Sequence, residues 1–547
     1  MGVKLFMGMG MVARYRRIMK NAPREILVNP NLLFSSLVFA FSAFPSVWDQ
    51  GSASVLPSLP GYQKFFHLST GANAGLIRNL VSLVYIGYAI GSASTFFIND
   101  RLGRLWSYRL YTFVYMIGQI VAITTPGLAG LNASRIVSGM GIGALTVTGP
   151  MTIAEISPDE IRGLLTSWFG VCMSLSLVTS VFCVYGAYIH MAADRLQYQI
   201  VWFMPILIMF VVNVGSFFCV ESPKWLMMVD RYDDALRALV TLRGLPADHP
   251  RVQAEITTIQ DDVRKAHIDS TNEWARIKRI LHDTFMIQTN LRRVVQSIVS
   301  YGFAQLSGAN QITSYLVPIM TLMGVGGSTE DQLFLSGMYG VAKLGSMILA
   351  SFLLVDALGR RNSLFIGITC QIVSHLYVGI YIKYNQEGHV THAASQGALA
   401  FLFIHAFGYV VGLFLLPYVF GAELWPDHIR TFGGAFSQTF HWLFIYAMNY
   451  GLPPLLTKTH NWGAFIFFAA MCFLAMLYVF FMVPETSELS TEEIDLLFQG
   501  PWFKAYKSQR KVIQGLILAK DEETAEPRSS ITKNSQIDVE EPVPKAS

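Results

Sequence analysis

Two charged residues interrupt long apolar runs at positions where they could exchange a proton. Asp49 lies about 17 residues into the first run, and Arg135 precedes Glu155 by 20 residues. At about 1.5 Å per helical residue, both side chains would lie near the same outer level of a membrane. A carboxylate that loses a nearby arginine holds a proton more readily, so this pair could couple movement to protons. The alternative is that Asp49 lies at the water interface and binds no transported proton.

Lys343 is a third charge within an apolar run. It precedes Asp356 by 13 residues, or about 20 Å along a helix, which places it near the middle of a membrane. An isolated charge at that depth costs at least about 2.5–3.5 kcal/mol. Lys343 therefore predicts either an anionic or polyhydroxyl substrate or an internal carboxylate partner. The alternative is a lysine whose ammonium group extends outward along its own stem.

A polar segment begins at Gln305 inside another apolar run. Its hydroxyl and amide groups need partners in a membrane interior, which favours a surface that faces a ligand or a cavity. Hydrogen bonding between helices is the alternative. The candidate substrate ligands in this segment are Gln305, Asn310, Gln311 and Tyr315.

Short charged phrases occur twice, in the same order and roughly 260 residues apart. Such repeats between apolar runs indicate duplicated membrane halves. We expect the charges to form an exposed salt-bridge network that closes an inner gate, because exposed pairs contribute only about 0–1 kcal/mol and open easily. Simple anchoring of helix ends is the alternative. The residues are Asp100, Arg104, Glu155, Arg162 and Glu221 in the first copy and Asp356, Arg360, Glu423, Arg430 and Glu485 in the second.

The apolar runs are the elements that must position these groups. Apolar residues make up 52% of the chain and charged residues 14%, against about 25% charged in soluble domains. Each run has about 20 residues, enough for a helix to cross about 30 Å of hydrocarbon. The sequence therefore predicts an all-α integral membrane protein with twelve transmembrane helices in two pseudo-symmetric bundles of six. The runs begin near Leu32, Gly75, Trp106, Ser134, Leu164, Ile200, Arg293, Phe334, Asn362, Ala398, Phe432 and Trp462.

Lysine and arginine gather before the first run and in the central segment. By the positive-inside rule these parts are cytoplasmic, so we expect both termini in the cytoplasm. We also expect the protein to lie in the plasma membrane. The net charge of +4 reflects this topology and gives no indication of nucleic acid. The expected parts are a cytoplasmic tail (1–31), a six-helix bundle (32–220), a cytoplasmic helical linker (221–292), a second six-helix bundle (293–484) and a mostly disordered cytoplasmic tail (485–547).

The remaining residues do not favour an enzyme. The chain shows no nucleophile–base set, and its five cysteines lie in apolar runs without metal-ligand spacing. We therefore expect no catalytic residue, no cofactor and no metal. The expected partners are a small-molecule substrate, protons and the lipid bilayer, and the expected assembly is a monomer.

Taken together, these phrases resemble the sugar porter family of the major facilitator superfamily, and fungal members in particular. The resemblance runs from about residue 32 to residue 495. It implies two six-helix bundles, a cytoplasmic helical linker and alternating access around a central site. The phrases are DRLGR at 100–104, SRIVSGMGIG at 134–143, EISPDEIRG at 155–163, ESPKWL at 221–226, QLSGANQITSY at 305–315, DALGRR at 356–361, AELWPDHIR at 422–430 and PETSELSTEEID at 484–495.

The resemblance also implies roles for single residues. Asp49 and Arg135 stand where proton-coupled members have an aspartate and its arginine partner. Gln305 and Asn310 match a glutamine and an asparagine that bind sugar hydroxyls.

Five positions depart from the family's hexose pattern and argue against simple glucose recognition. Three polar residues become apolar or small, a tryptophan becomes tyrosine, and the asparagine before Trp442 becomes histidine. These positions are Gly170, Ala304, Leu344, Tyr418 and His441. The further expected substrate-binding residues are Lys343, Tyr418, His441 and Trp442.

The favoured interpretation is a secondary active transporter that moves a sugar, polyol or sugar-like compound by alternating access with proton symport. One alternative is an importer of an acidic polyhydroxyl compound such as quinate, with Lys343 and His441 binding its carboxylate. Another is a non-transporting nutrient sensor, which would usually carry a longer cytoplasmic tail. Facilitated diffusion without protons also stays open.

Overall fold

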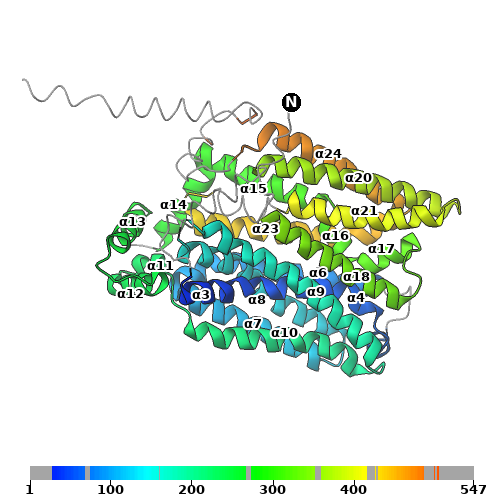
Figure 1. Cartoon of the computed structure of the whole chain (residues 1–547), viewed down its shortest axis with the longest axis horizontal. Coiled ribbons are helices and arrows are strands. Elements are labelled where there is room, and N and C mark those ends of the chain that lie inside the picture. Colours follow the sequence, from blue (N-terminus) through cyan, green and yellow to red (C-terminus); the bar gives the residue numbers. More distant parts are fainter. Residues whose placement is uncertain are drawn as a thin grey trace, which may run out of the picture.

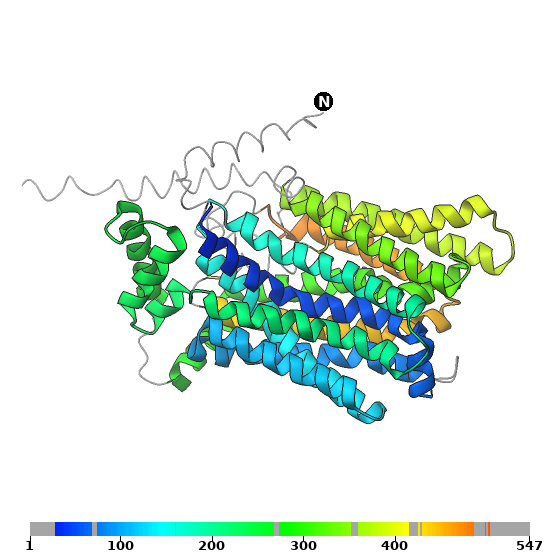
Figure 2. The same ribbon diagram turned by 60° about the horizontal axis from the view of Figure 1, so that its bottom comes forward.

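The computed structural model describes residues 28–67, 74–158, 160–266, 273–351, 359–414, 425–426, 429–485, 498 and 502–503. Within these ranges the ordered elements are helices, and none is a strand. The long helices run roughly side by side, and small helices project from one end of the molecule (Figures 1 and 2). We call this end, where α11, α12 and α13 lie, the linker end.

The first half of the chain forms six long helical segments. The first is composite, because short 3-10 turns follow both α3 and α4. Asn29 begins it by accepting a hydrogen bond from the backbone N–H of Asn31 at 2.9 Å, and Pro30 fits the first helical position. The helices are α3 (Pro30–Ala40), α4 (Phe44–Val55), α5 (Pro60–Phe65), α6 (Ala74–Leu102), α7 (Arg104–Thr124), α8 (Leu128–Ile156), α9 (Arg162–His190) and α10 (Arg195–Gly215).

The second half repeats this plan after a linker of short amphipathic helices. Its first long segment is broken at Gly308, whose φ of +75° is left-handed and therefore favours glycine. The linker helices are α11 (Pro223–Met228), α12 (Tyr232–Arg243), α13 (Pro250–Ala266) and α14 (Glu273–Met286). The second-half helices are α15 (Gln288–Leu306), α16 (Ala309–Ser314), α17 (Leu316–Met323), α18 (Thr329–Leu349), α20 (Arg360–Gln386), α21 (His392–Val411), α23 (Arg430–Lys458) and α24 (Trp462–Met482).

Helical segments occupy all twelve predicted positions. Within the described residues, eight of them are long and apolar enough to cross a membrane by length and composition. The other four, α7, α15–α17, α18 and α23, are more polar or broken. This is the predicted all-α membrane architecture, and it confirms the expected twelve-helix fold.

The two halves meet mainly where α9 packs on α18 and α6 packs on α23, and also where α4 contacts α16 and α17. Inside the first half, the backbones of α6 and α8 are in close contact. A Cβ at Gly139 would overlap the Gly87 backbone, so only glycine fits there. Small residues permit such close packing in membranes. Gly139 lies one turn after Arg135, so this contact fixes the depth of the arginine beside α4.

Candidate functional site

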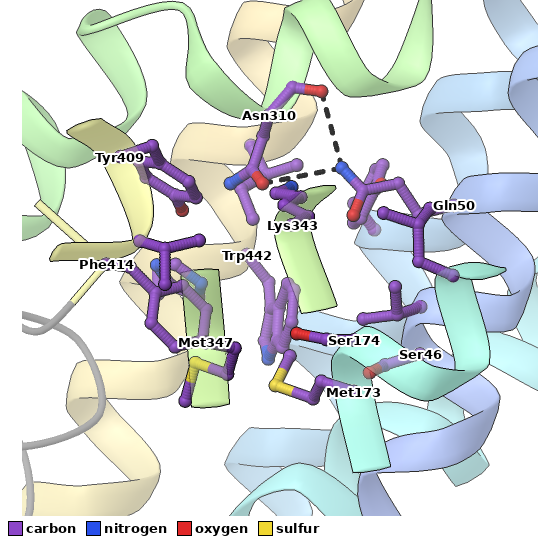
Figure 3. Close-up of a pocket in the computed structure, with 16 residues that line it drawn as sticks. Ser46, Gln50, Met173, Ser174, Asn310, Lys343, Met347, Tyr409, Phe414 and Trp442 are labelled. Atoms are coloured by element: carbon purple, nitrogen blue, oxygen red, sulfur yellow. Dashed lines mark hydrogen bonds between the residues drawn. The ribbon is translucent and has the colours of Figure 1, made fainter. Parts of the chain in front are cut away.

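A small pocket lies between the two halves (Figure 3). Its walls come from α4, α6 and α9 in the first half and from α16, α18, α21 and α23 in the second. The cavity volume is about 50 Å³, room for a few waters and far below the roughly 300–1,000 Å³ of ligand sites. A sugar-sized ligand therefore requires the halves to move apart.

Contacts between α6 and α23 lie on either side of the pocket, toward the two ends of the molecule. At the linker end the rings of Phe96 and Phe432 lie 5.2 Å apart. At the opposite end the Arg78 guanidinium lies 4.0 Å from the centre of the Tyr450 ring. Along α6 and α23, the two halves therefore touch on either side of the cavity.

Four of the predicted substrate-binding residues line the pocket: Asn310, Lys343, His441 and Trp442. Gln305 lies behind them. It accepts a hydrogen bond from Asn310 Nδ2 at 2.7 Å, and its amide nitrogen lies 3.3 Å from His441 Nδ1. Gln305 therefore orients two pocket residues rather than lining the cavity itself.

The other predicted ligands of the broken helix do not line the cavity in this conformation. Gln311 is buried, and neither polar atom of its side chain has a hydrogen-bond partner among the described residues. The Tyr315 hydroxyl donates to the carbonyl of Asn449 at 3.0 Å. Tyr418 lies outside the described residues.

Lys343 carries a buried charge at the pocket wall. Its side chain is 9% exposed, and Nζ donates to Thr313 Oγ1 at 3.0 Å. The Tyr409 ring centre lies 5.4 Å from the ammonium group. No carboxylate in the described part of the chain lies within 4.0 Å of it. Lys343 thus faces the cavity, and the described residues place no anion beside it.

Asp49 and Arg135 form a buried ion pair between α4 and α8, each only 3% exposed. Two parallel hydrogen bonds join them: Arg135 Nη2 donates to Asp49 Oδ2 at 2.8 Å, and Nη1 donates to Oδ1. Arg135 Nε also donates to the Leu80 carbonyl at 2.9 Å. Such bidentate charge-assisted pairs are strong and geometrically specific. The expected meeting of the two residues at one depth is therefore present.

Gln50 is a polar residue that the sequence reasoning missed. Its Nε2 donates to the Asn310 carbonyl at 3.3 Å and to Asn310 Oδ1 at 3.4 Å (Figure 3). It also donates to Ser314 Oγ at 3.3 Å. Successive helical residues point about 100° apart. Asp49 therefore holds α8 while its neighbour Gln50 holds α16 of the other half. The polar interruption of an apolar run that identified Asp49 would also have identified Gln50.

Two aromatic residues of α6 pack on Trp442, and one of them, Tyr85, also lines the pocket. Tyr85 stacks on the Trp442 ring with centroids 6.1 Å apart, and Tyr88 meets its edge at 4.6 Å. The indole nitrogen of Trp442 is buried and has no hydrogen-bond partner among the described residues. It is a free donor beside the cavity, as a hydroxyl-bearing ligand requires.

The first set of repeated charges forms a connected cluster at the linker end. Arg104 donates to both Glu155 oxygens at 2.9 and 2.8 Å and lies 3.3 Å from Asp100 Oδ1. Arg276 of α14 joins Asp100 at 3.0 Å. Our expectation of exposed, weak pairs was wrong here, because Arg104 is 1% exposed. Removing one partner of such a buried pair costs about 3–5 kcal/mol.

Glu221 and Glu485 cap equivalent helices in the two halves. Glu221 accepts from the backbone N–H of Arg104 at 3.0 Å, and Glu485 accepts from that of Arg360 at 3.0 Å. Each carboxylate thus lies at a helix N-terminus, which favours negative charge. Burial raises the pKa of Glu221, while backbone N–H donors oppose that rise.

The glycines before these helices, Gly103 and Gly359, share a left-handed φ of +88° and +82°. The chain therefore turns in the same way before α7 and before α20. Arg162 and Arg430 begin α9 and α23, so they also occupy equivalent helix starts. Asp356 and Glu423 lie outside the described residues.

Two helical halves around a central pocket with a few polar groups, and a buried ion pair in the first half, are the architecture of a multi-pass membrane transporter. The chain belongs to the sugar (and other) transporter family, whose family profile matches residues 35–498. The predicted resemblance is confirmed by this match.

Relatives of the chain include both quinate permeases and glucose transporters. A probable quinate permease of Aspergillus niger is 27% identical over 491 residues, covering 87% of this chain and 89% of the permease. The low-affinity glucose transporter HXT1 of Saccharomyces cerevisiae is also 27% identical, covering 86% and 82%. Identity alone thus does not separate the two kinds of relative.

Solved structures share the fold. The proton:xylose symporter XylE bound to 6-bromo-6-deoxy-D-glucose superposes with a TM-score of 0.72 at 21% identity, covering 86% of this chain and 100% of the symporter. A partially occluded inward-open form of XylE from E. coli gives 0.68 at 19% identity, covering 84% and 99%.

Proposed function

We propose that this protein moves a sugar, polyol or sugar-like compound across the membrane by alternating access, with proton symport. One observation carries the proposal: consecutive residues of α4 join a buried ion pair to the pocket wall of the opposite half. The test is an uptake panel of sugars, polyols and quinate in transport-deficient cells, with and without a protonophore. Saturable uptake that the protonophore reduces supports the proposal, and its absence for every compound would overturn it.

The proposed cycle begins when a proton binds Asp49. Neutral Asp49 no longer holds Arg135 by charge, so α4 is free to shift relative to α8. A shift of α4 alters the hydrogen bonds from Gln50 to Asn310 and Ser314. The occupancy of the proton site is thereby linked to the position of a substrate-binding helix. Contacts at Phe96–Phe432 and Arg78–Tyr450 then open in turn to give access from one side or the other.

Gln50→Ala is expected to weaken coupling while transport continues. The variant loses the bonds between α4 and α16, each worth about 0.5–1.5 kcal/mol, but keeps Asp49 and Arg135. The ratio of protons to substrate moved should fall below that of the wild type in reconstituted vesicles. Gln63→Ala is a matched control, because the Gln63 side chain bonds to the nearby Pro57 carbonyl of its own half. An unchanged proton ratio in Gln50→Ala would remove Gln50 from the coupling path.

Gln305→Ala and Asn310→Ala are expected to weaken apparent substrate affinity more than they lower expression. Losing a neutral hydrogen bond costs about 0.5–1.5 kcal/mol, or about two- to twelvefold in affinity. Concentration-dependent uptake measures the change, with Asn385→Ala, remote from the pocket lining, as the control. Unchanged affinity in both pocket variants would place the substrate elsewhere.

A second candidate cargo is an acidic polyhydroxyl compound such as quinate. The observation that favours it is Lys343, a buried cation at the cavity without a carboxylate among the described residues. His441 lines the same cavity and adds a second nitrogen-bearing group. A carboxylate bound beside Lys343 would gain a charge-assisted hydrogen bond that a neutral sugar cannot make.

The setting of the protein belongs to the same proposal. We propose a plasma-membrane monomer in the lipid bilayer, with both termini and the linker end in the cytoplasm. The proposed parts keep the boundaries expected from the sequence: 1–31, 32–220, 221–292, 293–484 and 485–547. The Lys/Arg distribution supports this orientation.

A further inference from the structure

Gly170 and Met347 face each other across the two halves of the protein. Gly170 belongs to α9 and Met347 to α18, and these helices pack along much of their length. A Cβ placed at Gly170 would overlap Met347 Cε and lie 3.3 Å from its sulfur. The methionine therefore occupies the space that any larger residue at position 170 would need.

Met347 also forms one wall of the central pocket (Figure 3). It lies one helical turn after Lys343, toward the end of α18 at Leu349. Met173, Val410 and Phe414 line the cavity with it, and Val410 and Val411 belong to the same apolar cluster as Met347. The thioether thus forms part of the apolar side of the cavity.

We propose that Met347 limits the size of the cargo, and that the missing side chain of Gly170 leaves the space in which the Met347 thioether packs. The inference rests on the proposed function, since it concerns a compound that occupies this pocket. Methionine is unbranched and adaptable, so it fills the irregular gap on this side of the pocket. A cargo with an added alkyl group on that side would meet the thioether instead of open space.

The test measures how well bulky analogues compete with the carried compound. Mono-O-methyl and mono-O-propyl ethers of D-glucose and of quinate are the competitors against radiolabelled D-glucose or quinate. In Met347→Ala, the propyl ether that points toward position 347 should gain about tenfold or more in apparent affinity relative to its parent compound. The reason is that one methylene in an apolar pocket changes binding by at least that factor. Met347→Leu keeps the volume and should keep the wild-type ratio.

A rescue experiment separates a pocket wall from simple core packing. Gly170→Ala should push Met347 into the cavity and lower the apparent affinity for the parent compound. The double variant Gly170→Ala/Met347→Ala should restore that affinity. Met347→Val, a smaller change, repeats the measurement if Met347→Ala fails to fold. Normal parent uptake with unchanged competitor ratios in the Met347 variants would overturn this inference alone. Absence of saturable uptake of every parent compound by the wild type would overturn the proposed function as well.

Discussion

Asp49→Asn is expected to abolish accumulation against a gradient while substrate still equilibrates across the membrane. Asparagine has nearly the shape of aspartate but cannot bind and release a proton at this position. The buried Arg135 then has no titrating partner on α4. Time courses of radiolabelled uptake should level off at equal concentrations inside and outside, whereas the wild type should exceed them.

Two further variants distinguish a loss of proton coupling in Asp49→Asn from a loss of folding. Losing one partner of a buried ion pair costs about 3–5 kcal/mol, so Asp49→Asn should lower thermal stability, and Asp49→Asn/Arg135→Gln should recover part of it. Asp194→Asn, at the exposed start of α10, controls for the substitution itself. Accumulation that persists in Asp49→Asn and still collapses with a protonophore would exclude Asp49 from coupling.

Lys343→Ala is expected to reduce uptake of an anionic cargo far more than that of a neutral one. Only the anion loses a charge-assisted bond, worth about 1.5–3 kcal/mol, or about 10- to 150-fold in affinity. The neutral compound loses at most an ordinary hydrogen bond to Nζ. Apparent affinities for quinate and for D-glucose, measured on the same membranes, give the comparison.

Lys383→Ala is the matched control, because Lys383 lies near the end of α20 against the Trp462 ring, and it should change neither affinity. Equal losses for both compounds in Lys343→Ala would assign the lysine to folding or gating. Robust glucose transport by the wild type would also count against an acidic cargo.

The fold was predictable because hydropathy and repeated phrases are local signals. Twelve apolar runs gave the helix positions, and the phrases near Arg104 and Arg360 marked equivalent helix starts in both halves. The depth of Asp49 and Arg135 was predictable for a similar reason, since helical rise converts residue spacing into distance. Their roles in proton coupling stay predictions.

The details of the site depend on tertiary packing and were harder to predict from the sequence. No sequence spacing shows that Gln50 reaches Asn310 or that Met347 fills the space above Gly170. Gln305 orients Asn310 from behind, because the break at Gly308 turns the two side chains toward each other. Burial of Arg104 likewise follows from the packing of neighbouring helices and could not be derived from its position at a helix end.

The most direct test of proton-coupled transport uses purified protein in vesicles with an imposed pH gradient and no other energy source. Radiolabelled D-glucose and quinate are offered outside, with the outer solution more acidic. We predict transient accumulation of at least one of them above its external concentration, abolished by a protonophore and absent in Asp49→Asn vesicles. Uptake of either compound that only equilibrates, with the same rate whether or not the gradient is present, would contradict the account.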